Sequence, residues 1–220
     1  MKKLIFVLAA VSIITVQQSK AQKQIKEGKV EYELTYEGID EQYAAYMPKG
    51  MTISFKDQKN RTDMQLGMGM NQTIIYDGEK KERFMLQDMM GKKAAIKMDS
   101  KEKKDADPKV EKTAETKTIA GYKCNKVIIT DEEGNKTELW VTKDIIAAHD
   151  ESEYKGVDGF MMEANISLSN QGMEGTMIMA AKKVSPEKID SKQFEIPADY
   201  KVMTQEEFRK MMTGGGGSDE

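Results

Sequence analysis

The chain has 220 residues and a formal net charge of −3, and it contains one histidine and one cysteine. Metal and hydrolytic centres need several converging His, Cys, Asp or Glu side chains, and an acidic surface has no general attraction for nucleic acid or anionic membranes. We therefore expect a protein that is not an enzyme, with no catalytic residues, no metal site, no cofactor and no nucleic-acid partner.

The N-terminus has the pattern of a secretory signal peptide. Two lysines precede an apolar run from Leu4 to Val16, and the small side chains of Ser19 and Ala21 suit cleavage after Ala21. The run of 13 residues is shorter than the roughly 20 that cross a bilayer, so we expect no stable membrane insertion. Cleavage removes three lysines and no acid, which changes the charge from −3 to −6. We predict a periplasmic or secreted protein.

The rest of the chain has the size of one domain. Residues 22–213 are long enough to bury a core, and the glycine-rich residues 214–220 are expected to form a flexible tail. An oxidising compartment favours paired cysteines, yet Cys124 has no partner. Packing rather than disulfide bonding must therefore stabilise the fold.

The main structural signal is an alternation of apolar and polar residues. Over residues 29–37 the apolar positions Val30, Tyr32, Leu34 and Tyr36 point to one side, which indicates a strand with one solvated face. The same pattern predicts strands at residues 51–55, 61–66, 72–77, 82–87, 93–98, 121–130, 137–142, 160–168 and 173–184. About ten one-sided strands predict a mainly β fold with a large antiparallel sheet, which must either curl around its own apolar side or pair with a second sheet.

Helical signals are few, and the clearest lies near the C-terminus. Residues 204–212 are predicted to form a helix, with Thr204 as N-cap and Glu207 as its capping-box partner. Met203 and Phe208 are placed for a hydrophobic staple, and Phe208, Met211 and Met212 share one face. Two shorter helices are predicted within residues 39–47 and 144–154.

Residues 99–117 are highly charged and almost free of apolar side chains. Such a segment cannot pack into a core, so we predict a mobile charged loop. The lone His149 is interpreted as an exposed polar residue, and Cys124 as a small buried side chain, because neither has a neighbouring group that would make it reactive.

Methionine is unusually frequent, with 18 residues in the chain. Met68 and Met70 are two residues apart, as are Met177 and Met179, so each pair points to one face of an extended segment. Three interpretations remain open: filling of an irregular core, lining of a cavity for apolar ligands such as acyl chains, and binding of Cu(I) by thioethers.

Three segments resemble a known family: TIAGYKC at 118–124, ELWVTKDI at 138–145, and FEIPADYKVMTQEEF at 194–208. The family consists of secreted bacterial proteins described as a domain of unknown function, whose members are similar in fold to the outer-membrane lipoprotein carrier LolA. The resemblance covers residues 28–212 and implies a half-barrel whose apolar concavity is plugged by short helices. In the carrier an arginine helps to release the lipid, but neither Arg61 nor Arg83 can be matched to it.

These observations favour a binding protein that holds a lipid or a lipidated protein in a methionine-lined concavity, with the C-terminal helix as a lid. The expected ligand-binding residues are Met68, Met70, Met162, Met177, Met179, Phe208, Met211 and Met212. The alternatives are a packed envelope-associated scaffold without a ligand and, less favoured, a Cu(I)-handling protein. The oligomeric state is left open.

Overall fold

The computed structural model describes residues 24–67, 70–89, 91–98, 108–148, 155–168 and 174–213. The predicted signal peptide at 1–21, His149 and the tail at 214–220 lie outside these residues. In the described part of the chain, no helix is both long enough and apolar enough to cross a membrane.

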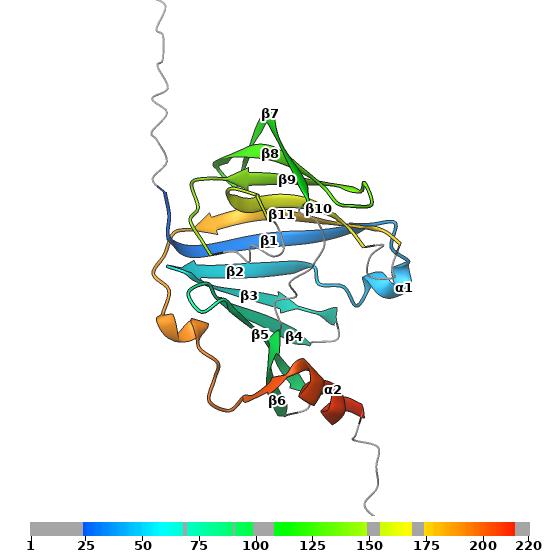
Figure 1. Cartoon of the computed structure of the whole chain (residues 1–220), viewed down its shortest axis with the longest axis vertical. Helices are drawn as coiled ribbons and strands as arrows, with labels where there is room; N and C mark the ends of the chain where they lie inside the picture. Colours follow the sequence, from blue (N-terminus) through cyan, green and yellow to red (C-terminus); the bar gives the residue numbers. More distant parts are fainter. Residues whose placement is uncertain are drawn as a thin grey trace, which may run out of the picture.

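The described residues form one sheet of twelve strands, which confirms a mainly β fold with a large curved sheet (Figure 1). The strands are β1 (Glu27–Glu37), β2 (Gly50–Lys56), β3 (Lys59–Gln65), β4 (Asn71–Asp77), β5 (Glu82–Met89), β6 (Lys92–Met98), β7 (Lys109–Ile119), β8 (Tyr122–Thr130), β9 (Lys136–Thr142), β10 (Phe160–Ser167), β11 (Thr176–Ser185) and β12 (Lys201–Thr204). They lie in the order β12-β6-β5-β4-β3-β2-β1-β11-β10-β9-β8-β7. Neighbouring strands are antiparallel, except that β12 runs parallel to β6.

The alternation predicted for β1 decides which face of the sheet is buried. Val30, Tyr32 and Leu34 are buried, whereas Glu31 and Glu33 between them are exposed. We call the face that carries Val30 and Tyr32 the inner face, and the face that carries Glu31 the outer face. On the outer face the carboxylates of Glu31 and Glu33 pair with the ammonium groups of Lys183 and Lys182, at 2.9 and 2.6 Å.

The sheet curls around its inner face. The rings of Phe55 on β2 and Phe160 on β10 have centroids 5.8 Å apart, although β1 and β11 lie between these two strands. In a flat sheet, three strand spacings would separate them by about 14 Å. The Tyr32 hydroxyl on β1 also donates a hydrogen bond to the Met161 carbonyl oxygen on β10, at 2.7 Å. The curl brings distant strands together around one main core.

The C-terminal segment packs on both faces of the sheet at the end formed by β12, β6 and β5. On the outer face, Ile196 and Tyr200 pack against a buried cluster on β4, β5 and β6. On the inner face, Ala94, Ile96 and Met203 form a second buried cluster, which we call the distal cluster. The helix α2 (Gln205–Thr213) lies against β6 and β12 at this place (Figure 1).

Two helix predictions are confirmed. α2 begins directly after Thr204, whose Oγ1 accepts a hydrogen bond from the Glu207 backbone N–H at 3.1 Å, while the Glu207 carboxylate accepts one from the Thr204 N–H at 2.7 Å. α1 (Glu41–Ala44) lies within the predicted residues 39–47. A short 3-10 helix, η3 (Ser191–Phe194), was not expected from the sequence.

The third helix prediction, within residues 144–154, is tested only in part, because residues 149–154 lie outside the described residues. Residues 144–148, the described part of 144–154, contain no helix. Ile145 instead forms an isolated parallel bridge with Ile25, and its side chain is buried in the main core.

The prediction of a mobile charged loop over residues 99–117 is wrong for its second half. Residues 109–119 form β7, which pairs with β8, while residues 99–107 lie outside the described part. β7 is an edge strand that is mostly exposed, so it does not need the alternating apolar residues that reveal a half-buried strand. Its threonines favour extended structure, and charged residues are common on sheet edges.

Candidate functional site

Three of the expected ligand-binding methionines lie in the filled part of the sheet. Met162 on β10 and Met179 on β11 are buried within the main core, and Met177 packs against that core. The register shows that Met179 lies opposite Leu34 and Met177 opposite Tyr36, so both methionines belong to the inner face, as the alternation predicts. In the structure these three side chains fill the core.

The other expected residues lie elsewhere. Phe208 and Met211 of α2 pack against the distal cluster, and Met212 points away from it with 55% of its surface exposed. Met70 is 53% exposed in the connection before β4, and Met68 lies outside the described residues. The expected set is therefore divided between the main core, the helix α2 and a loop.

Between the main core and the distal cluster, the inner face is only partly covered. Met51 and Ile53 on β2 pack against the main core, and Met85 on β5 packs against the distal cluster. Met64 on β3 and Ile74 on β4 lie between them, are half-buried, and belong to neither cluster of the described residues.

The strand register places these side chains in two rows across the sheet. One row runs through Tyr32, Met51 and Met64, and the other through Val30, Ile53, Thr62, Ile74, Met85 and Ile96. We call the part of the inner face that carries Met64 and Ile74 the apolar span. Alternation in the sequence indicates that both residues face inward, but it contains no signal for how far the core extends along the sheet.

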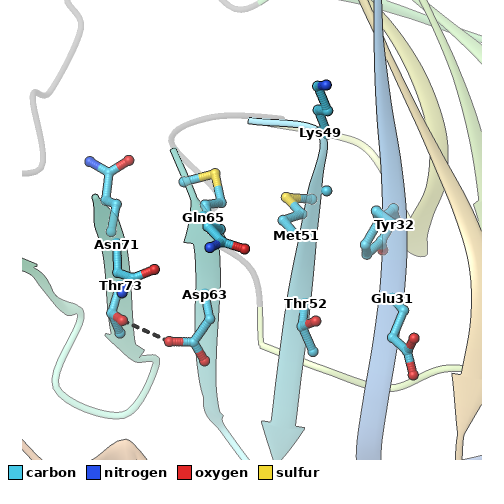
Figure 2. A pocket seen from close by; sticks show the side chains of 12 residues that line it. Glu31, Tyr32, Lys49, Met51, Thr52, Asp63, Gln65, Asn71 and Thr73 are labelled. Carbon is cyan, nitrogen blue, oxygen red and sulfur yellow. Dashed lines mark hydrogen bonds between the residues drawn. The ribbon is translucent and has the colours of Figure 1, made fainter. Parts of the chain in front are cut away.

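A polar depression of about 440 Å³ lies over β1 to β4 (Figure 2). Its polar lining includes Glu31, Thr52, Asp63 and Thr73, which are opposite one another in the register and belong to the outer face. Figure 2 shows Lys49 and Asn71 at one end of the depression and Glu31 at the other. The volume falls within the range of small-molecule sites, although the depression is open and polar.

Asp63 is held by several contacts at the edge of this depression. Its carboxylate accepts hydrogen bonds from Arg61 Nε at 2.8 Å and from the Thr73 hydroxyl at 2.7 Å. Arg61 also donates to the Gln193 carbonyl oxygen at 3.2 Å, which connects β3 to η3. Arg61 therefore ties the C-terminal segment to the outer face.

Cys124 lies buried in the main core, with its Sγ 3.4 Å from the Tyr122 carbonyl oxygen, as its interpretation as a small core residue predicts. Burial raises the pKa of the thiol to about 11. No group of three or more His, Cys, Asp or Glu residues suited to a metal ion occurs within the described part of the chain.

Comparison with known proteins supports the family and the fold. The family model described as "Domain of unknown function (DUF4412)" matches residues 27–150. None of the curated proteins matches the chain in sequence.

The solved structures that are similar to this one include the following two. The structure of PNGF-II in space group C2 has a TM-score of 0.55 and 14% sequence identity, over 85% of this chain and 32% of PNGF-II. The crystal structure of an uncharacterized conserved protein from Thermus thermophilus has a TM-score of 0.47 and 8% identity, over 81% of this chain and 91% of that protein. This chain thus spans about a third of PNGF-II, and at 14% identity the likeness concerns the fold alone.

Proposed function

Since the chain belongs to the DUF4412 family, whose function is unknown, we propose a function from the geometry: the protein is a non-enzymatic binding protein that holds an acyl chain on its apolar span. The signal-peptide pattern of residues 1–21 supports a location in the periplasm or outside the cell. The acyl chain belongs to a lipid or to a lipidated protein.

One observation carries the proposal. Met64 and Ile74 face the curled side of the sheet, yet they remain half-buried between two packed clusters. Apolar side chains on a concave face gain free energy, at about 25 cal/mol per Å², when a ligand removes their surface from water. The thioethers of Met51, Met64 and Met85 at or beside the span adapt to ligands of irregular shape.

A packed scaffold without a ligand is the second candidate. It is favoured by the complete burial of Met162 and the near-complete burial of Met179, which fill the core where a cavity was expected. The two candidates differ in what the apolar span does, because a scaffold would not need to receive a ligand there.

Uptake of Nile red, an uncharged dye, distinguishes them. We expect the chain from Gln22 onward, which contains every described strand, to bind the dye while folded and to release it when a fatty acid competes. The Met64→Asp variant places a carboxylate on the apolar span, and we expect its dye affinity to fall at least about tenfold, because burying an unpaired charge is costly.

The matched control is Gln65→Asp, which adds the same carboxylate to the next residue of β3, exposed and on the opposite face. It should leave dye affinity unchanged. If the wild-type protein takes up no dye without unfolding, or if both variants lose affinity equally, the packed scaffold is the better assignment.

A further inference from the structure

Exposed apolar side chains gather at one end of the sheet. Six large hydrophobic residues of the described chain are exposed, and three of them belong to two neighbouring connections. Tyr43 and Tyr46 lie on α1 and the turn after it, between β1 and β2, and Met70 lies between β3 and β4. Their exposed fractions are 53, 55 and 53%. We call these three residues the rim.

The two connections that carry the rim are bonded to each other. The Gly67 N–H, between β3 and β4, donates a hydrogen bond to the Tyr46 carbonyl oxygen, between β1 and β2, at 3.1 Å. Within the connection between β3 and β4, the Leu66 N–H donates one to the Met70 carbonyl oxygen at 2.8 Å. A Cβ atom at Gly67 would lie 2.5 Å from the Ala45 carbonyl oxygen, so only glycine permits this approach. The two connections that carry the rim therefore lie against each other, although they are far apart in the sequence.

The polar depression begins beside the rim. Lys49, Gln65 and Asn71 line its end and are close in sequence to Tyr46 and Met70 (Figure 2). Its charges have both signs, because the exposed Lys49 lies at this end and the exposed Glu31 at the other. The pairing of Glu31 with Lys183 is solvent-exposed, and such pairs are easily exchanged for other partners.

We propose that the rim and the adjoining depression dock on a bilayer of zwitterionic phospholipid, an inference that rests on the proposed function because the membrane would deliver or receive the acyl chain. The rim inserts its apolar side chains among the headgroups. Tyrosine suits this position because its ring is apolar while its hydroxyl forms hydrogen bonds with water or headgroups. Lys49 pairs with a headgroup phosphate and Glu31 with a headgroup ammonium. Charges of both signs complement this headgroup better than an anionic one, which attracts clusters of basic residues.

Flotation with phosphatidylcholine vesicles tests the docking. The wild-type chain from Gln22 onward should float with the vesicles, and the Tyr43→Ser, Tyr46→Ser, Met70→Ser triple variant should bind at least about tenfold more weakly, because less apolar surface enters the interface. If the triple variant melts at a clearly lower temperature than the wild type, the single variant Met70→Ser replaces it, with an expected loss of about threefold.

The matched control is the Val202→Ser, Met212→Ser double variant, which removes two side chains that are each 55% exposed on β12 and α2, away from the rim. It should float like the wild type. The proposal is overturned if the wild type does not bind phosphatidylcholine vesicles, or if the control loses as much binding as the triple variant. It is also overturned if sedimentation shows that the rim instead joins two copies of the chain.

Nile red uptake without vesicles separates this inference from the proposed function. The triple variant should take up the dye like the wild type, because the rim is not part of the apolar span. Flotation without dye uptake would contradict the acyl-chain function and support membrane docking alone. Dye uptake without flotation would contradict the membrane docking and support the acyl-chain function alone.

Discussion

At the scale of single residues, Cys124 illustrates how burial decides reactivity. Its side chain is fully buried in the main core, and the pKa of its thiol is raised to about 11, chiefly because burial disfavours the charged thiolate. The thiolate is the reactive form of cysteine. In the folded protein, Cys124 therefore acts as a small apolar side chain and not as a nucleophile.

We expect iodoacetamide at pH 8 to alkylate Cys124 more than about a hundredfold more slowly in the folded protein than in urea, because few thiols are ionised and none is accessible. Mass spectrometry of quenched samples measures both rates. The control combines Cys124→Ala with Asn125→Cys, which moves the thiol to the exposed neighbouring position. Equal rates for the folded and unfolded wild type would contradict the burial.

At the scale of elements, α2 depends on both its cap and its apolar face. The reciprocal hydrogen bonds of Thr204 and Glu207 satisfy backbone donors at its start. Phe208 and Met211 then pack against the distal cluster, while Met212 stays in solvent. Whether this helix also acts as a lid over the ligand stays a prediction.

Replacing Thr204 by Ala should destabilise α2 by about 1 kcal/mol, because the backbone N–H of Glu207 loses its acceptor. Amide hydrogen exchange measures this change locally: protection within α2 should fall about fivefold, while protection in β1 stays the same. Thr204→Ser keeps the hydroxyl and serves as the control. Uniform loss of protection in α2 and β1 would mean that the helix unfolds only with the whole sheet.

At the scale of the whole molecule, Glu27 joins three distant parts of the chain. Its carboxylate on β1 accepts a hydrogen bond from the Ile189 N–H at 2.7 Å and pairs with Lys56 on β2 at 3.1 Å. Lys56 in turn donates to the Ile189 carbonyl oxygen at 3.0 Å. These contacts attach the segment that follows β11 before it crosses the outer face of the sheet.

The contacts of Glu27 make stability depend on pH. The hydrogen bond from Ile189 and the Lys56 ammonium lower the pKa of Glu27 below its ordinary value of 4.5. A carboxyl whose pKa is lowered by folding stabilises the folded state fully at pH values above its ordinary pKa. This contribution is lost as the pH falls through the folded-state pKa. We therefore expect Glu27→Gln to be less stable than the wild type at pH 7 and to approach it at pH 3.

Urea unfolding at the two pH values measures the difference. Glu33→Gln is the control, since that carboxylate forms an exposed pair with Lys182 and should have little effect at either pH. The contrary outcome is that Glu27→Gln and the wild type differ in stability by the same amount at pH 7 and pH 3. That result would contradict the idea that the carboxylate charge attaches the segment after β11.

Local patterns were sufficient to predict most of the strands. Alternation in residues 29–37 identified β1 and its buried face, and the S/T-x-x-E spacing at Thr204 identified the start of α2, because both patterns follow from the geometry of a single element. β7 and β12 were missed, since an edge strand and a four-residue strand do not show a long one-sided pattern.

The sequence by itself determined which side chains face inward, but only the tertiary structure decided which of them are buried. Met162, Met64 and Met85 all occupy inward positions of strands, yet the first fills the core, the second lies on a partly covered span and the third packs beside α2. The physical reason is that inward orientation is set by the two-residue period of one strand. Burial depends on how far the sheet curls and on which distant segment lies over it.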